Sequence, residues 1–152
     1  VDVVGNLMDP AMIRKLKAGK FKCILLANLL EHVRNRAVVA AACEDIVGPG
    51  GLVLATAPAR YPFHAGPIDT GYRPSPDELA AEFRRSRVLL AEEVAGPTYG
   101  EDLRAHGIGP WLALARTAGW ALLAPARPRS FASRAHRWLW YRRPHRVSIS
   151  LL

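Results

Sequence analysis

The stretch from Lys22 to Thr56 most constrains the fold, because it places two short apolar runs on either side of a helical pattern. The first run, Cys23–Ala27, has the length of a buried strand and does not alternate between polar and apolar residues. The helical pattern ends at Gly48-Pro49-Gly50-Gly51, where glycine allows positive φ angles without steric cost. Together with the second run, Leu52–Thr56, this pattern predicts two parallel strands joined by a helix, with both sheet faces covered.

Further strands and helices are expected around this unit. Strand composition or alternation is seen at three places: Val1–Leu7, Arg87–Val94 and Arg146–Leu152. Capping signals and helical spacing predict helices that follow Asp9 and Asn35, run from the Ser75 capping box to about Arg85, and cover Trp111–Ala118 and Phe131–Tyr141. Gly96–Pro110 is rich in turn residues. The fold class is therefore α/β, with residues 1–152 forming a single domain.

The composition fits a globular domain, since 50% of the 152 residues are hydrophobic and 22% are charged. No apolar run approaches the roughly 20 residues that a membrane-spanning helix needs. No signal-peptide pattern is seen at Val1-Asp2, so we expect a cytoplasmic protein. Cys23 and Cys43 both lie within apolar patterns, which predicts buried free thiols.

The net charge of +8 is unevenly distributed along the chain. The last acidic residue is Asp102, and the charged side chains that follow it are all arginines. These arginines can contact phosphates or an anionic surface, or they can form a solvated face. Between about residues 111 and 143 they alternate with aromatic residues, which can stack on bases, lie at a membrane interface or pack in a core beneath arginine stems. The core interpretation leaves the aromatic rings unavailable to bases, so we expect nucleic acid to be a weaker candidate as partner than a small molecule.

The polar junction after the first apolar run and the glycine-rich turn resemble class I S-adenosylmethionine-dependent methyltransferases. In this family a strand, Leu-Glu-His-Val, a helix, Pro-Gly-Gly and a strand follow one another, as Leu30–Val33 and Pro49–Gly51 do here. Val4–Leu7 is similar to the family's third strand and Arg146–Leu152 to its last strand. The resemblance implies a Rossmann-like, mostly parallel sheet with an antiparallel last strand, in the order third, second, first, fourth, fifth, seventh, sixth. It also implies methyl transfer from S-adenosylmethionine.

The family's glycine-rich cofactor loop, an acidic residue followed by Gly-x-Gly-x-Gly, has no counterpart in the sequence. The acidic residue that ends the family's second strand is missing as well. The chain therefore resembles the C-terminal portion of a methyltransferase, an incomplete fold in which the first two strands are absent. We expect Cys23–Ala27 to be an unpaired sheet edge and the isolated chain to bind cofactor poorly. The alternative is a truncated or degenerate domain that acts as an interaction module through its basic C-terminal half.

By this resemblance, residues at the strand ends face the cofactor. Asn6 stands where the family commonly has an Asp that accepts a hydrogen bond from the adenine amino group, and Leu7 follows it. An Asn in a strand-end turn is the alternative interpretation of Asn6. Asn28, Leu29 and Leu30 follow the strand whose carboxyl end is expected to face the ligand.

Glu31 and His32 have three possible roles. They can orient the loop, His32 can act as a general base or contact the acceptor, or both can bind a metal. Some relatives have a metal-binding Glu-x-x-Glu-His motif, but Asn28 stands at its first position here. Because an amide replaces a hard carboxylate ligand, no metal is assigned.

The long segment Pro58–Pro76 contains five prolines and several polar side chains. By the resemblance, it faces the methyl acceptor, which we expect to be a small molecule or a glycan-type compound. His64 and Asp69 are candidates to remove a proton from an acceptor hydroxyl or amine. The alternative is a proline-stiffened lid whose polar groups face solvent.

Overall fold

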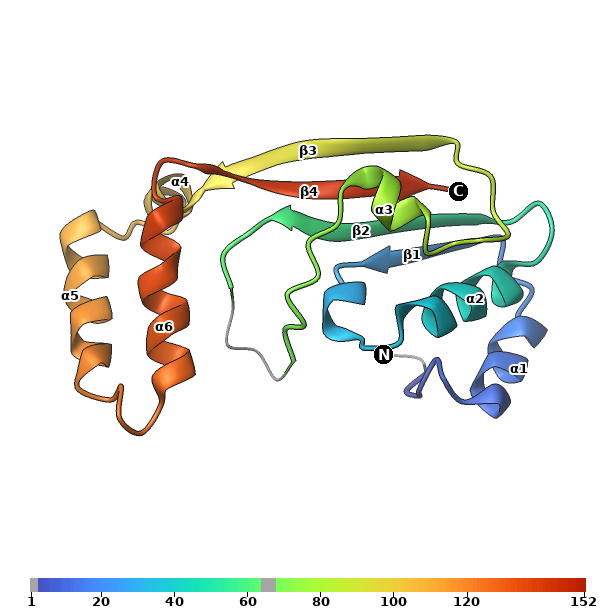
Figure 1. Cartoon of the computed structure of the whole chain (residues 1–152), viewed down its shortest axis with the longest axis horizontal. Helices are drawn as coiled ribbons and strands as arrows, with labels where there is room; N and C mark the ends of the chain where they lie inside the picture. Colours follow the sequence, from blue (N-terminus) through green and yellow to red (C-terminus); the bar gives the residue numbers. More distant parts are fainter. Residues whose placement is uncertain (1–2, 64–67) are drawn as a thin grey trace.

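The computed structural model describes residues 3–63 and 68–152 and has an α/β fold with a four-stranded sheet (Figure 1). The strands are β1 (Cys23–Ala27), β2 (Leu52–Arg60), β3 (Leu90–Thr98) and β4 (Pro144–Leu151). The α-helices are α1 (Pro10–Ala18), α2 (Arg36–Val47), α3 (Pro76–Ala80), α4 (Tyr99–Ala105), α5 (Pro110–Ala121) and α6 (Pro128–His136). Two 3₁₀ helices complete the fold: η1 (Leu30–His32) and η2 (Arg137–Trp140).

The sheet order is β1-β2-β4-β3, as the strands lie side by side in Figure 1. β1 and β2 are parallel, with Cys23 opposite Leu52, which confirms the predicted strand–helix–strand unit. β4 is antiparallel to both β2 and β3. Three strands, β1, β2 and β3, therefore run in the same direction, and their carboxyl ends lie at one edge of the sheet.

The hydrophobic core lies between the sheet and the helices α2 and α3. Leu26, Val53 and Phe83 are each at most 5% exposed in this core. On β4, the inward-facing Ser148 and Ser150 donate hydrogen bonds of 2.7 and 3.0 Å to the carbonyl oxygens of Pro74 and Pro76. These bonds fix the start of α3 against the sheet, and the predicted Ser75 capping box at that start is present.

The opposite face of the sheet is mostly apolar and open to solvent. Leu25 is 64% exposed, whereas its neighbour Leu26 is 5% exposed, because successive side chains of a strand point to opposite faces. Other aliphatic residues of this face are exposed or half-buried, and we call them together the open face: Leu25, Leu52, Leu54, Leu90, Val94, Val147, Ile149 and Leu151. Cys23 is on this face and is exposed, which corrects the prediction of two buried thiols; Cys43 is buried.

The prediction of a strand at Val1–Leu7 is wrong for the residues that the structure describes. Residues 3–6 have no regular structure, and Leu7 lies in a turn. A β-strand forms only against a hydrogen-bonding neighbour, and residues 3–7 have none among the described strands. Val4 is accordingly 86% exposed.

Several predicted element boundaries also differ from the structure. The strand predicted at Arg87–Val94 is shifted and covers Leu90–Thr98, because pairing with β4 sets its register. The helix that follows Ser75 ends at Ala80 instead of Arg85, since the chain turns there and brings Arg85 to Glu44. The helix expected at Phe131–Tyr141 begins at Pro128 and ends at His136, where η2 follows.

The segment Gly96–Pro110, predicted to form turns, contains the helix α4. Thr98 caps this helix: its side chain accepts a hydrogen bond from the Glu101 backbone, and the Glu101 side chain accepts one from Thr98. Asn35, in contrast, precedes α2 without a side-chain capping bond. Within the described ranges, no helix is both long and apolar enough to cross a membrane.

Candidate functional site

The residues that follow the carboxyl end of β1, Asn28 to His32, form a segment that we call the rim. Asn28 has a φ of 47°, in the left-handed region, so the chain turns sharply out of the sheet. Its backbone N–H donates to the Thr56 carbonyl over 3.1 Å, and Thr56 Oγ1 donates to Asn28 Oδ1 over 3.2 Å. The Asn28 side chain is therefore held at the solvent-exposed edge by the neighbouring strand.

Leu29 and Leu30, also predicted to contact the cofactor, have different environments. Leu29 is partly buried against the core, and Leu30 is 0% exposed within it. Since no part of Leu30 is exposed, its contact with a cofactor stays a prediction for the complete site.

Glu31 is buried at the start of the rim loop, with 2% of the residue exposed. Its carbonyl oxygen accepts hydrogen bonds from the N–H and Oγ1 of Thr70, at 3.0 and 2.8 Å. Its carboxylate Oε2 makes no hydrogen bond with any residue that the structure describes. A buried carboxylate oxygen in this state is costly, which marks Glu31 as a candidate to meet a ligand.

His32 is oriented by a hydrogen bond between its Nδ1 and the carbonyl oxygen of Ile68. Because a carbonyl oxygen can only accept, Nδ1 carries the hydrogen in this arrangement. In the neutral imidazole Nε2 is then the basic nitrogen, and it lies 3.8 Å from Glu31 Oε1. The His32 side chain is 32% exposed, so it is accessible from solvent at the rim.

Asp69 is tied to the loop and not to the rim in the contacts described. Its side chain is 1% exposed and binds the Arg73 guanidinium with both oxygens, at 3.1 and 2.8 Å. Asp69 Oδ1 also accepts the Gly71 N–H over 2.9 Å. These contacts give Asp69 a role in shaping the loop. His64, the other loop candidate, lies outside the described residues.

Asn6 and Leu7 lie before α1 and not at a strand end. Asn6 Oδ1 accepts the Met8 N–H over 2.9 Å, and the Asn6 carbonyl accepts the Asp9 N–H over 3.0 Å. This is the turn that was the alternative interpretation of Asn6. Leu7 packs partly buried against the core, and contact of either residue with a cofactor stays a prediction.

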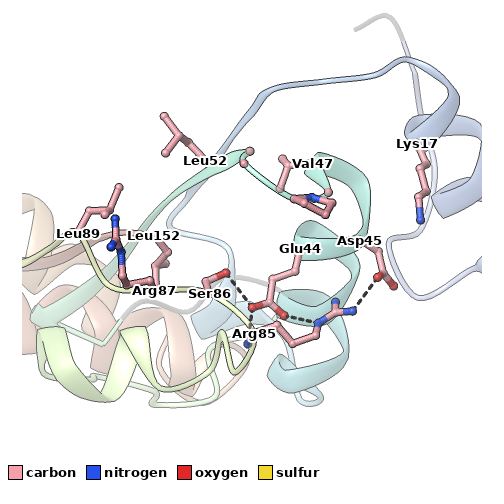
Figure 2. Close-up of a pocket in the computed structure, with 14 residues that line it drawn as sticks. Lys17, Glu44, Asp45, Val47, Leu52, Arg85, Ser86, Arg87, Leu89 and Leu152 are labelled. Atoms are coloured by element: carbon pink, nitrogen blue, oxygen red, sulfur yellow. Dashed lines mark hydrogen bonds and ion pairs between the residues drawn. The ribbon is translucent and has the colours of Figure 1, made fainter.

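A cavity of about 620 Å³ lies at the opposite edge of the sheet, near the amino end of β2 (Figure 2). Figure 2 shows the Arg85 guanidinium between Glu44 and Asp45, to which it bonds over 3.0 and 2.8 Å. Burial by itself raises the pKa of Glu44, but hydrogen bonds from Arg85 and Ser86 outweigh it and the net pKa is lowered. The acidic side chains of this cavity, Glu44 and Asp45, therefore already have Arg85 as a partner and hold it against α2.

A smaller cavity of about 330 Å³ was missed by the sequence reasoning. It lies between the segment that follows β2, the helix α4 and the start of β4, and its polar lining residues are Tyr61, Tyr99, Asp102, His106, Arg137 and His145. Only the capping pattern Thr98-x-x-Glu101 could have revealed α4 from the sequence. The sequence pattern does not indicate that Tyr61 and His145 are neighbours, because the pairing of β2 with β4 brings them together.

No group of three or more His, Cys, Asp or Glu side chains in the described part of the chain is arranged to hold a metal ion. A comparison with models of known protein families finds no match to this sequence, and a comparison with curated proteins finds none either. A functional interpretation therefore depends on the fold and on the geometry of the rim.

Proposed function

We propose that this chain is the C-terminal portion of an S-adenosylmethionine-dependent methyltransferase domain. The order of its strands carries the proposal. A chain of four strands joined in simple succession would form the order 1-2-3-4, but here the last strand lies antiparallel between β2 and β3. The order β1-β2-β4-β3 is the one that this methyltransferase family has for its fourth, fifth, seventh and sixth strands.

The open edge of the sheet supports the same proposal. β1 pairs with β2 on one side and has no described strand on its other side. In the family order, the first strand and its glycine-rich loop would lie there, next to Asn28. Neither the loop nor the first two strands have counterparts in this sequence, so we assign the missing half of the cofactor site to a different part of a longer enzyme.

The rim residues fit the chemistry of methyl transfer. S-Adenosylmethionine, when bound, supplies an electrophilic methyl group on a sulfonium sulfur. Asn28 offers a rigid side-chain amide at the carboxyl edge, where ligands of open α/β sheets bind. The Oε2 of buried Glu31 has no hydrogen-bond partner among residues 3–63 and 68–152 and offers an acceptor for a polar group of the ligand. His32 can receive a proton at Nε2, because its other nitrogen is held as a donor by Ile68.

Binding of S-adenosylhomocysteine to the complete gene product, measured by calorimetry, tests the proposal. We expect Asn28→Ala to weaken binding about tenfold, as the loss of one well-oriented hydrogen bond would. Asn35→Ala is the matched control, since Asn35 makes no side-chain capping bond and lies beyond the rim. The gene should encode an acidic-Gly-x-Gly-x-Gly strand end upstream of Val1. Absence of both binding and this motif would refute the assignment to the methyltransferases. Tight binding to the isolated 152 residues would refute the inference that half of the cofactor site lies in another part of the enzyme.

A non-catalytic interaction module is the second candidate. It is favoured by the exposed, cationic helices α5 and α6: Trp111 on α5 is 81% exposed, and Leu122, which follows α5, is 85% exposed. If these helices hold nucleic acid, the affinity for RNA or DNA will fall steeply with salt. Binding that does not depend on salt would remove this form of the alternative.

A further inference from the structure

The helices α4, α5 and α6 are inserted between β3 and β4, at the end of the sheet where β1, β2 and β3 all finish. In Figure 1, α5 and α6 stand beside that end, and the arrowheads of β1 and β2 point toward it. The smaller cavity opens within this insertion. It therefore lies at the same edge as the rim of Asn28 and His32, where an acceptor would have to meet the cofactor.

His145 is the buried polar group of this cavity. It is 7% exposed, and its Nε2 has no hydrogen-bond partner among the described residues. Its ring contacts the Tyr61 ring at a tilt of 46°, with centroids 4.6 Å apart, and its centroid lies 5.9 Å from that of the Trp140 ring. An imidazole held by flat rings and lacking a partner for one nitrogen is prepared to bond a ligand that enters the cavity.

Burial lowers the pKa of His145 below its ordinary value of 6.5; Asp102 opposes this effect and Arg137 adds to it. His145 is therefore neutral at pH 7 and can accept a hydrogen bond or a proton. The other titratable groups that face the cavity are Tyr61, Tyr99 and His106. His106 is held on α4, because its Nδ1 contacts the Asp102 carbonyl oxygen over 2.7 Å.

Arg137 adds a positive charge to the cavity wall. Neither its guanidinium nor the Asp102 carboxylate forms an ion pair with a described residue. Leu103 and Ile108 supply apolar wall, and Tyr61 and Tyr99 supply flat aromatic surface. The lining therefore combines aromatic surface for a ring, one acceptor for a hydroxyl group, one cation for an anionic group and one carboxylate, that of Asp102. The volume of about 330 Å³ is at the small end of ligand cavities.

We propose that this cavity binds the methyl acceptor, and that the acceptor is a small hydroxylated aromatic acid; its role as acceptor site rests on the proposed methyltransferase function. The ring lies against Tyr61 and Tyr99, the carboxylate binds Arg137 and the hydroxyl group donates to His145 Nε2. In the transfer, the hydroxyl oxygen forms a bond to the methyl carbon as the carbon–sulfur bond breaks. The electron pair of that bond stays on sulfur, which becomes a neutral thioether, and the hydroxyl proton passes to His145.

The test measures binding of 4-hydroxybenzoate to the complete polypeptide by calorimetry. We expect His145→Phe, which keeps an aromatic ring between Tyr61 and Trp140, to weaken binding about tenfold. Arg137→Gln should weaken it by a similar factor, whereas Arg143→Gln, an exposed arginine outside the cavity, should not. Benzoate, which lacks the hydroxyl group, should respond to Arg137→Gln alone, and phenol to His145→Phe alone.

The pH dependence of binding gives a second signature. Because the folded pKa of His145 is below 6.5, its contribution should be constant above that pH and disappear as His145 is protonated at lower pH. Equal binding by all variants, or no binding of any probe, would overturn the proposal. Because Arg137 is exposed, we expect Arg137→Gln to fold, and it tests the proposed ligand cavity even if His145→Phe does not fold.

The two proposals fail in different ways. Binding of S-adenosylhomocysteine without binding of 4-hydroxybenzoate would refute the acceptor site and leave the methyltransferase proposal intact. Binding of 4-hydroxybenzoate that depends on His145 and Arg137, without binding of S-adenosylhomocysteine, would support the ligand cavity and refute its acceptor role.

Discussion

Thr56 donates a hydrogen bond to Asn28 across 3.2 Å, so the residue that follows β1 is fixed by a side chain of β2. The same two residues are joined through the Asn28 N–H and the Thr56 carbonyl. The polar rim therefore begins as a continuation of the sheet and not as a separate loop. Its position depends on the parallel pairing of two strands that the sequence itself predicts.

Asn28→Gly should be more stable than Asn28→Ala. Both changes remove the bond to Thr56, but only alanine has to adopt the φ of 47° with a Cβ atom, which costs about 1 kcal/mol. Urea denaturation should show this difference in the free energy of unfolding. At Arg14, an exposed position inside α1, the order should be reversed because glycine destabilises a helix interior, and the same order at both sites would contradict the prediction.

Glu31→Gln should leave the free energy of unfolding unchanged or raise it by about 1 kcal/mol at pH 7. The amide has the shape of the carboxyl group and costs less to bury, and the backbone bonds to Thr70 remain. Thr70→Val, which removes the bond from Oγ1, should cost about 1 kcal/mol by comparison. A loss of more than about 1 kcal/mol in Glu31→Gln, measured by urea denaturation, would mean that a charged partner holds this carboxylate.

Glu44→Ala should lower the free energy of unfolding by about 2 kcal/mol at pH 7, since Glu44 accepts bonds from the Arg85 backbone, the Arg85 side chain and Ser86. The folded pKa of Glu44 is below the ordinary 4.5, so its contribution is fully present above pH 4.5. It is lost as the pH falls through the folded pKa. The difference between native protein and variant should shrink over that range of a denaturation series, and a constant difference would be unexpected. Arg84→Ala is the control.

Leu25→Lys should change the free energy of unfolding by less than about 0.5 kcal/mol, because Leu25 is 64% exposed on the open face. Leu26→Ala, on the covered face of the same strand, should cost about 2–5 kcal/mol. Light scattering should also show that Leu25→Lys reduces self-association of the isolated chain, since the lysine places a charge on the open face at the edge strand β1. Equal losses of the free energy of unfolding in the two variants would contradict the difference in burial between the two faces of β1.

The unit from Cys23 to Thr56 could be predicted because all its signals are local. An apolar run of strand length, a helical stripe and a glycine turn each depend on neighbours within a few residues, and Gly48 and Gly50 do have positive φ angles. Val1–Leu7 could not be predicted in this way. Its composition suits a strand, but a strand also needs a partner, and that requirement is not written in its own residues.

The candidate site was only partly predictable for a similar reason. Asn28 and His32 were identified because they directly follow an apolar run. The cavity of His145 depends on Tyr61, which is brought to it by the pairing of β2 with β4 across more than eighty residues of sequence. The pairing of Asp69 with Arg73 through both carboxylate oxygens could not be read from the sequence either, because it depends on how the loop folds.

The antiparallel position of β4 has a consequence for how the chain is made. β2 and β3 are neighbours of β4 and not of each other, so β3 has no strand to pair with until the ribosome has released β4. During synthesis, β1, α2 and β2 can assemble early, while β3 remains without its neighbouring strand β4. Chaperones that shield an unpaired strand would act on β3 during this interval.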